Sequence, residues 1–111
     1  MDDQIITRVL LMYAVIFRST RTLHHEDLYQ EHSEKMEKLV KTIKGYISHH
    51  SQRDPDTREG ITVSYFESLE SIKQWREHPE HRVSQEFGRT HFYTWYEFQI
   101  VKVERKYEWA K

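Results

Sequence analysis

Histidine spacing offers the first candidate chemistry in this sequence. His78 and His81 lie three residues apart, so on one helix they would share a face and could bind a metal ion together with Glu77 or His91. No third ligand lies at a convincing spacing, and a histidine at a helix break beside a surface histidine explains the same pattern. We therefore predict no metal site.

Two arginines are candidates for holding an acidic ligand. The guanidinium groups of Arg53 and Arg89 could each orient a carboxylate or a phenolate, because the planar fork of donors matches two acceptor oxygens. The alternative is a salt bridge with Glu67 or Glu86. The sequence leaves both interpretations open.

Other catalytic patterns are missing from the sequence. The adjacent pairs His24-His25 and His49-His50 direct their side chains apart in a strand or loop, and we expect them to be solvated. There is no Gly-rich phosphate loop, no Ser-His-Asp order and no close carboxylate pair of interpretable context. Nucleotide-binding, hydrolase and glycosidase functions therefore have no support.

The composition describes a small domain with a heavily charged exterior. The chain has 111 residues, with 17 Lys and Arg against 18 Asp and Glu, and no cysteine. This balance gives no field that would recruit nucleic acid or an anionic membrane, and the lack of cysteine excludes disulfides and thiolate chemistry. With no signal-like segment and no apolar span of about 18 residues, we expect one cytoplasmic domain over residues 1–111.

Apolar patterning predicts the elements of the first half. Residues 8–18 are almost continuously apolar, as expected of a central strand covered on both faces. From Leu28 to Ile43 apolar residues recur at three- and four-residue steps, which predicts an amphipathic helix ending at Gly45. Residues 45–53 and 60–66 have strand character around a turn-rich segment and predict a hairpin.

The second half predicts a broken helix and a final strand. Ser68 can cap a helix that breaks near His78 and Pro79, and a proline in the first turn allows the helix to restart and run to about Trp95. Residues 96–107 alternate as in a strand, but the apolar face switches midway. The switch requires either a bulge or a strand buried on both faces at different points.

The resulting order, β-α-β-β-α-β, predicts an α+β fold of the ferredoxin-like type. Its four-stranded antiparallel sheet carries both helical segments on one face. Two strongly apolar strands cannot then have both faces covered within one chain, so we predict a homodimer in which a partner sheet covers the second face. The alternative, a monomer, would expose a larger apolar patch than soluble monomers usually carry.

Several short segments stand in a characteristic order and spacing along nearly the whole chain. These are Tyr13-Ala14-Val15-Ile16-Phe17, Gly45-Tyr46-Ile47, Ser51-Gln52-Arg53, GITVSYFES (60–68), Ile72, Trp75, His78-Pro79-Glu80-His81, Gln85, Gly88-Arg89 and Val103-Glu104-Arg105. In these segments the chain resembles the antibiotic biosynthesis monooxygenase family, and in particular its mostly uncharacterised bacterial branch.

The resemblance implies a dimeric α+β barrel, in which two ferredoxin-like sheets face each other and a pocket lies between each sheet and its helices. The family includes cofactor-independent monooxygenases that oxidise quinol-like compounds, haem-degrading monooxygenases, and members without established activity. Its haem-degrading members carry an axial histidine ten residues after the tryptophan that matches Trp75. Gln85 occupies that position here, and an amide is a poor iron ligand, so haem is disfavoured unless His81 substitutes.

Cofactor-independent oxygenation, which the resemblance implies, needs an electron-rich substrate, a base and a pocket that excludes water. His81 is the best base by its ordinary pKa of about 6.5. We predict His81 and Tyr65 as catalytic residues, and as substrate-binding residues Tyr13, Trp75, Gln85, Arg53 and Arg89. For the aromatic residues, ordinary core packing is the simpler explanation in so small a domain.

Three functions follow as expectations. The first is a monooxygenase acting without metal, flavin or other cofactor on a small aromatic or quinol-type compound. The second is a dimeric module that binds a small molecule without catalysis, and the third is a haem-binding or haem-degrading protein.

Overall fold

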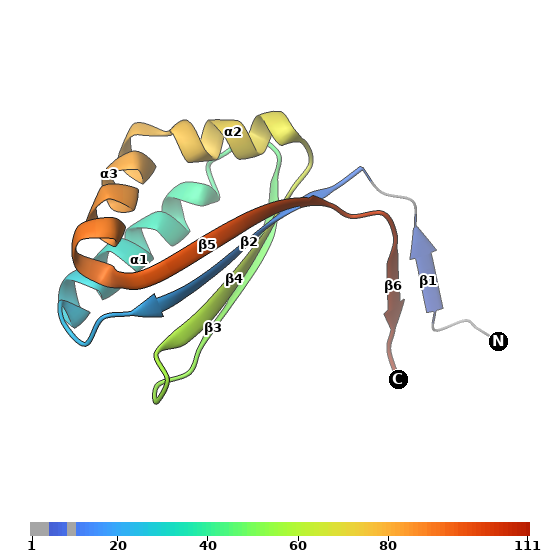
Figure 1. The fold of residues 1–111 in the computed structure, drawn as a ribbon. Coiled ribbons are helices and arrows are strands. Elements are labelled where there is room, and N and C mark those ends of the chain that lie inside the picture. The colour runs from blue at the N-terminus through green and yellow to red at the C-terminus, as the bar shows by residue number, and fades with distance from the viewer. Residues whose placement is uncertain (1–4, 9–10) are drawn as a thin grey trace.

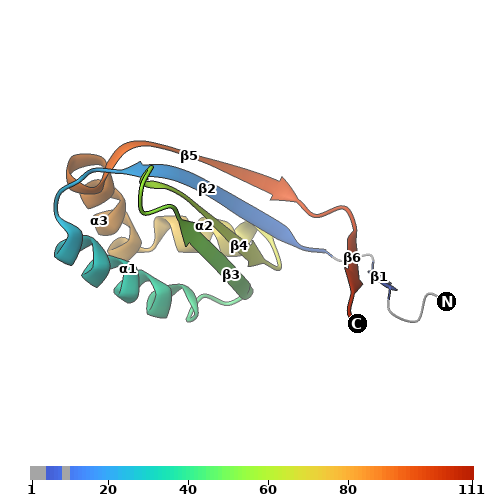
Figure 2. The same ribbon diagram turned by 90° about the horizontal axis from the view of Figure 1, so that it is seen from below.

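A four-stranded antiparallel sheet with helices on one face forms the body of the chain. The computed structural model describes residues 5–8 and 11–111. The strands are β2 (Tyr13–Arg21), β3 (Tyr46–Arg53), β4 (Glu59–Phe66) and β5 (Tyr93–Lys102), in the spatial order β3-β4-β2-β5. The helices are α1 (Glu26–Val40), α2 (Leu69–Glu77) and α3 (Pro79–Phe87), all on the same side of the sheet (Figures 1 and 2). This confirms the predicted ferredoxin-like α+β fold.

The core lies between the sheet and the helices. Val40 of α1, Phe66 of β4 and Ile72 of α2 are almost completely buried and pack together, and Tyr13 and Trp75 are among the half-buried residues packed against them. Burying these large apolar groups is the main favourable contribution to folding. The cluster therefore fixes α1 and α2 over β4 and β2.

Side-chain caps set the boundaries of α2 and α3. The Ser68 hydroxyl accepts a hydrogen bond from the Ser71 backbone N–H at 3.1 Å, which satisfies one free donor in the first turn of α2. His78 ends α2 and also caps α3, since its Nδ1 accepts from the Glu80 N–H at 3.2 Å and Pro79 occupies the first turn. The structure thus has the predicted break at His78 and Pro79.

Two predicted helix ends are wrong by several residues. The first helix ends at Val40, and Gly45 instead turns the chain into β3 with a φ of 93°. The last helical segment does not reach Trp95, because a π-helical turn (Gly88–Phe92) follows α3 and Tyr93 already pairs with Arg21 of β2. At the first helix the apolar spacing continues to Ile43, past the end of α1, whereas at the last one sheet pairing begins before the apolar helical pattern has ended.

β5 carries apolar residues on both faces without a bulge at the predicted switch. Its register against β2 is continuous from Tyr96 to Lys102, so successive side chains simply alternate. Ile100 lies on the helix side and Val101 on the opposite side. The register shift lies instead at the start of β5, opposite Thr20 and Arg21.

The ends of the chain form a separate two-stranded ribbon, β1 (Ile5–Arg8) paired with β6 (Lys106–Trp109). It projects beyond the end of the sheet (Figures 1 and 2). Just after β5, the Val103 N–H donates to the Met12 carbonyl at 2.9 Å. The predicted single strand over 96–107 is wrong, because β5 ends at Lys102 and β6 begins only at Lys106. The predicted strand over 8–18 includes residues 9–10, which lie outside the described residues.

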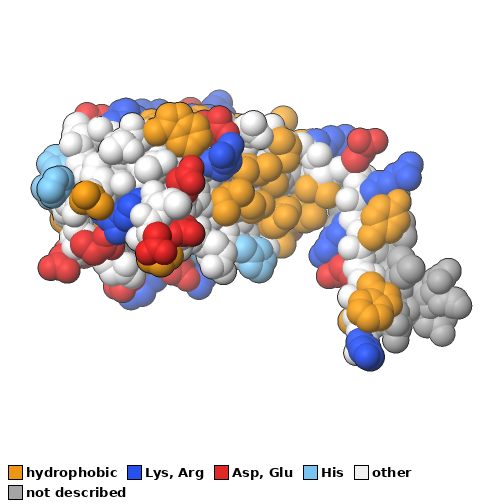
Figure 3. Space-filling model, turned by 60° about the horizontal axis from the view of Figure 1, so that its bottom comes forward, with side chains coloured by type: hydrophobic (Ala, Val, Ile, Leu, Met, Phe, Trp, Pro, Cys, Tyr) orange, Lys and Arg blue, Asp and Glu red, His pale blue; other side chains and the backbone are white. Residues whose placement is uncertain are grey.

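No helix of the described chain covers the second face of the sheet. Because Phe66 faces the helices, its neighbour Tyr65 and the alternate residues of the adjacent strands face the opposite way. Apolar side chains gather on this side, next to the ribbon (Figure 3). We call this surface the open face; its residues include Ala14, Ile16, Arg18, Ile61, Val63, Tyr65, Gln99 and Val101. None of the helices in the described part of the chain is long and apolar enough to cross a membrane.

Candidate functional site

A cleft of about 630 Å³ lies where α2, α3 and β5 meet. Figure 1 shows how α2 and α3 lie on the helix side of the sheet, above β5. The volume falls within the range typical of small-molecule sites. The lining residues are Leu69, Ile72, Lys73, Arg76 and Glu77 of α2, Arg82, Gln85 and Glu86 of α3, Arg89 of the π-helical turn, and Ile100 of β5.

Cations predominate in the cleft, with four Lys and Arg side chains against two carboxylates. Arg89 pairs with Glu86, and hydrogen bonds to Tyr96 and Glu86 raise the pKa of the Arg89 guanidinium, which keeps it charged. The guanidinium of Arg76 lies 4.2 Å from the centre of the Phe98 ring, a cation–π contact that holds it against β5.

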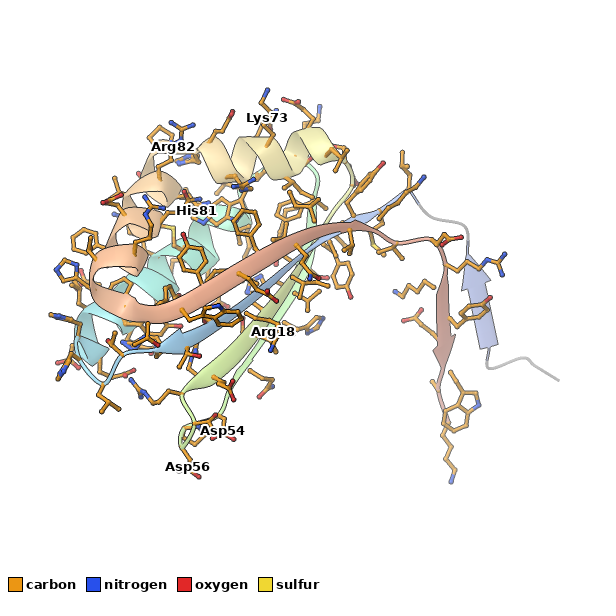
Figure 4. All side chains as sticks on the ribbon, in the orientation of Figure 1. Arg18, Asp54, Asp56, Lys73, His81 and Arg82 are labelled. Atoms are coloured by element: carbon orange, nitrogen blue, oxygen red, sulfur yellow. The ribbon has the colours of Figure 1, made fainter. Side chains whose placement is uncertain are left out.

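The inner side of the α2–α3 corner carries a stacked pair, Trp75 and His81. The two rings are nearly parallel, at 14°, with their centres 3.8 Å apart. The Nδ1 atom of His81 lies 2.9 Å from the Trp75 carbonyl oxygen. A carbonyl only accepts hydrogen bonds, so Nδ1 carries the proton and Nε2 keeps a lone pair. In Figure 4 His81 lies below this corner, whereas Arg82 and Lys73 lie on its upper side.

Burial changes the acid–base character of His81. Loss of solvent lowers the pKa of its imidazole to about 4; the bond to Trp75 partly offsets this effect, and the charges of Arg76 and His78 add to it. His81 is therefore neutral at pH 7. It can accept a hydrogen bond through Nε2, but it is a weaker base than its ordinary pKa suggested.

His81 and Gln85 also tie α3 to the end of α2. They stand four residues apart on α3, and their side chains donate to the consecutive carbonyls of Trp75 and Arg76, at 2.9 Å and 3.4 Å. These carbonyls belong to the last turn of α2, where few backbone donors are available; the Trp75 carbonyl also accepts from the His78 N–H at 3.2 Å. Both side chains thus have a structural role, whatever else they do.

The structure brings together only some of the predicted site residues. Gln85 and Arg89 line the cleft, whereas Trp75 and Tyr13 pack against the core behind it. Tyr65 lies on the open face and so does not share a site with His81 within one chain. For Arg89 the structure contains the alternative that the sequence offered, the ion pair with Glu86.

Arg53 lies in a separate polar cluster at the other end of the sheet. One of its terminal nitrogens donates to the Ser19 hydroxyl and the other to the Arg58 carbonyl, both at 2.7 Å. Gly60 provides room for the guanidinium, since a Cβ at that position would overlap it. Its donors are used in holding β2, β3 and β4 together, and it does not reach the cleft.

The cleft residues that sequence reasoning missed have a recognisable spacing. On α2 they are Leu69, Lys73 and Arg76, and on α3 Arg82, which stands at three- and four-residue steps from Glu86 and from the predicted residues Gln85 and Arg89. Each set forms one stripe of its helix. The stripes could have been found from the sequence, but not their convergence on Ile100 of β5.

The chain belongs to the antibiotic biosynthesis monooxygenase family, whose sequence profile matches residues 12–86. It is 39% identical over 94 residues to the uncharacterised protein YqjZ of Bacillus subtilis (strain 168), an alignment covering 85% of this chain and 81% of YqjZ. The predicted relationship to this family is thereby confirmed.

Solved structures share the fold at low sequence identity. SnoaB of Streptomyces nogalater, described as a cofactor-independent oxygenase, superposes with a TM-score of 0.70 at 11% identity, over 83% of this chain and 92% of SnoaB. Rv0793 of Mycobacterium tuberculosis superposes with a TM-score of 0.71 at 13% identity, over 81% of this chain and 92% of Rv0793.

The cleft does not fit a haem iron, and His81, the substitute that the resemblance allowed, is not part of its lining. The position that the resemblance assigns to an axial histidine is Gln85, whose amide is turned toward the Arg76 carbonyl. The cleft lining contains no His, Cys, Met or Tyr side chain that could coordinate iron. Within the described residues, no group of three or more His, Cys, Asp or Glu side chains could hold a metal ion.

Proposed function

We propose that this chain is a cofactor-independent monooxygenase that oxidises a small aromatic or quinol-type compound and works as a cytoplasmic homodimer. The observation that carries the proposal is the His81–Trp75 pair, a partly buried neutral imidazole with a free Nε2 lone pair. Membership of the family and the fold shared with an oxygenase support it. Nothing in the charge distribution favours nucleic acid as a partner.

The chemistry needs no external reductant. In an anthrone-type substrate a ring CH₂ becomes C=O, and the second oxygen atom of O₂ leaves as water, so the substrate supplies all the electrons that O₂ takes up. The enol form of the substrate gives one electron to O₂ and its hydroxyl proton to Nε2 of His81. The substrate radical and the superoxide formed in this step then combine at the ring carbon. The imidazolium returns its proton to the resulting peroxide, which loses water.

A pKa of about 4 still allows His81 to act in this sequence. A neutral phenol is much too weak an acid to protonate such an imidazole outright. A phenol that loses an electron becomes a strong acid, however, so the proton can move as the electron leaves. His81 would serve as an oriented acceptor within this coupled step, and Trp75 would hold its ring in place.

The other predicted residues take supporting roles in this proposal. Tyr13 and Trp75 pack against the core and would form an apolar wall beside His81, whereas Gln85 and Arg89 line the neighbouring cleft and would contact the polar end of the substrate. Tyr65 belongs instead to the open face, and Arg53 to the fold.

A second copy of the chain is the best cover for the open face. Apolar residues of β2, β4 and β5 share this face, which no element of the described chain covers. The ribbon of β1 and β6 points past the sheet with Tyr107 58% and Trp109 63% exposed. Isolated two-stranded ribbons are only marginally stable in water, so a partner that also packs against the ribbon would stabilise it.

Oxygen uptake tests the enzymatic proposal. Purified protein would be incubated with anthrones and dihydroxynaphthalenes, and we expect enzyme-dependent consumption of one O₂ per substrate. His81→Asn keeps an amide N–H for the Trp75 carbonyl but removes the Nε2 acceptor, so it should lower kcat by about 100-fold or more. His24→Asn, a change at an exposed histidine, should leave the rate unchanged. No uptake above the uncatalysed rate across the panel would contradict the proposal.

A non-catalytic binding module is the second candidate. It is favoured by the structural roles of His81 and Gln85, both of which are occupied in joining α3 to α2. In that case the same aromatic compounds would bind and be recovered unchanged under oxygen.

A further inference from the structure

We propose that the cleft between α2, α3 and β5 is built for an amphipathic ligand, an apolar ring system bearing a carboxylate. This goes beyond the proposed function, because the lining of the cleft includes neither His81 nor Trp75. Binding in the cleft is therefore a separate claim from catalysis at His81.

The cleft presents an unusual amount of apolar surface for an exposed position. Leu69, Ile100 and Phe98, which lies under Arg76, are between 40% and 55% exposed. Large apolar side chains scattered singly on a surface need no explanation, but three around one cleft form a patch. A flat apolar molecule could pack against their combined surface.

Positively charged side chains surround this apolar surface. Lys73 and Arg76 lie three residues apart on α2, so their like charges repel, and Arg82 adds a third cation from α3. Within the described residues, none of these three side chains forms an ion pair; of the two carboxylates present, Glu86 is engaged by Arg89. A ligand carboxylate would relieve the repulsion.

Arg76 is the residue best placed to bind the ligand carboxylate. Its guanidinium carbon lies 4.2 Å from the centre of the Phe98 ring, and this contact restricts the side chain, so it loses less conformational freedom when it binds. A guanidinium in this position can donate two parallel hydrogen bonds to a carboxylate while the ring system lies against Ile100 and Leu69. The neutral amide of the same ring would lose the charge-assisted bonds.

The test compares 1-naphthoate with 1-naphthamide, which has the same ring and no charge. Titration followed by backbone amide NMR shifts should give a dissociation constant about tenfold lower for the acid than for the amide. The shifted amides should map to α2, α3 and β5. Acetate, which has the charge but no ring, should not bind measurably.

Two variants and a matched control locate the site. Arg76→Gln and Arg82→Gln should each weaken binding of 1-naphthoate, the former by about tenfold, and leave 1-naphthamide nearly unchanged. Lys35→Gln removes one charge from the exposed side of α1 and should have no effect. Equal affinity for acid and amide, or an equal loss in Lys35→Gln, would overturn the proposal.

The outcome is separate from that of the enzymatic proposal, because 1-naphthoate is not an oxidisable quinol. If the function fails, no oxygen uptake occurs while 1-naphthoate still binds. If the inference fails, anthrones without a carboxylate are oxidised while acid and amide bind alike.

Discussion

At the scale of single residues, His81 shows how burial changes the acid–base behaviour of a side chain. Its type and its place near a helix start suggested a base titrating near neutral pH. The stack on Trp75 and the loss of solvent instead hold the imidazole neutral, with Nδ1 committed to a carbonyl. In any catalytic role, Nε2 must therefore be the acceptor, and the proton must move to it as the substrate loses an electron.

The same burial predicts a pH dependence of stability. In the unfolded chain His81 takes up a proton near pH 6.5, but in the folded chain only at about pH 4. Between these values the unfolded chain binds more protons, so the free energy of unfolding decreases as the pH falls through this window. The loss from this group reaches roughly 3 kcal/mol at the acid end, and none arises above neutral pH.

Urea unfolding at about pH 7.5 and about pH 4.5 measures this effect. Other groups also titrate in this range, so the comparison is between the parent chain and His81→Asn, which should lose less stability on acidification. His24→Asn, at an exposed histidine, should behave like the parent. The same acid loss in parent and His81→Asn would contradict the assignment.

At the scale of elements, the α2–α3 corner positions the candidate site. Ser68 starts α2, His78 ends it and starts α3, and the side chains of His81 and Gln85 fix the angle between the two helices. The cleft exists because the helices diverge at this corner over the edge of β5.

Capping of α2 leads to a prediction about stability. Ser68→Ala removes the acceptor for the Ser71 N–H and the contact between the two hydroxyls at 2.9 Å. We expect it to lower the free energy of unfolding by about 1 kcal/mol. Ser33→Ala, in the exposed middle of α1, should change it by less than about 0.5 kcal/mol. Chemical denaturation of both variants decides the point, and equal effects would show that the cap is unimportant.

At the scale of the whole molecule, the open face and the ribbon favour association of two chains. The apolar half of the open face lies beside the ribbon (Figure 3). A partner chain there would cover both surfaces at once.

Val101→Asp tests the proposed dimer. The substitution would bury an unpaired charge between two sheets, and we expect it to shift the chain to a monomer of about 13.7 kDa in light scattering at micromolar concentration. Val83→Asp makes the same change at an exposed site on α3, and this variant should still have the mass of a dimer. A monomeric parent chain would contradict the arrangement.

The sequence by itself determined the order and type of the elements. Helical and strand periodicities depend on neighbours a few residues away, so the four strands of the sheet, the hairpin, the Ser68 cap and the break at Pro79 could be predicted, but not the ribbon of β1 and β6. The boundaries at Val40 and Tyr93 could not be predicted either, because the apolar spacing continues past the end of α1 and because pairing with the distant strand β2 begins β5 inside the predicted helix.

Only the tertiary structure decided which candidate residues share a site. It separated Tyr65 and Arg53 from His81, and it joined Arg76, Arg82 and Ile100 into one cleft. It also lowered the pKa of His81, because desolvation depends on what packs around a group rather than on its neighbours in sequence. The sequence determined local conformation, whereas the convergence of α2, α3 and β5 created the chemical environment.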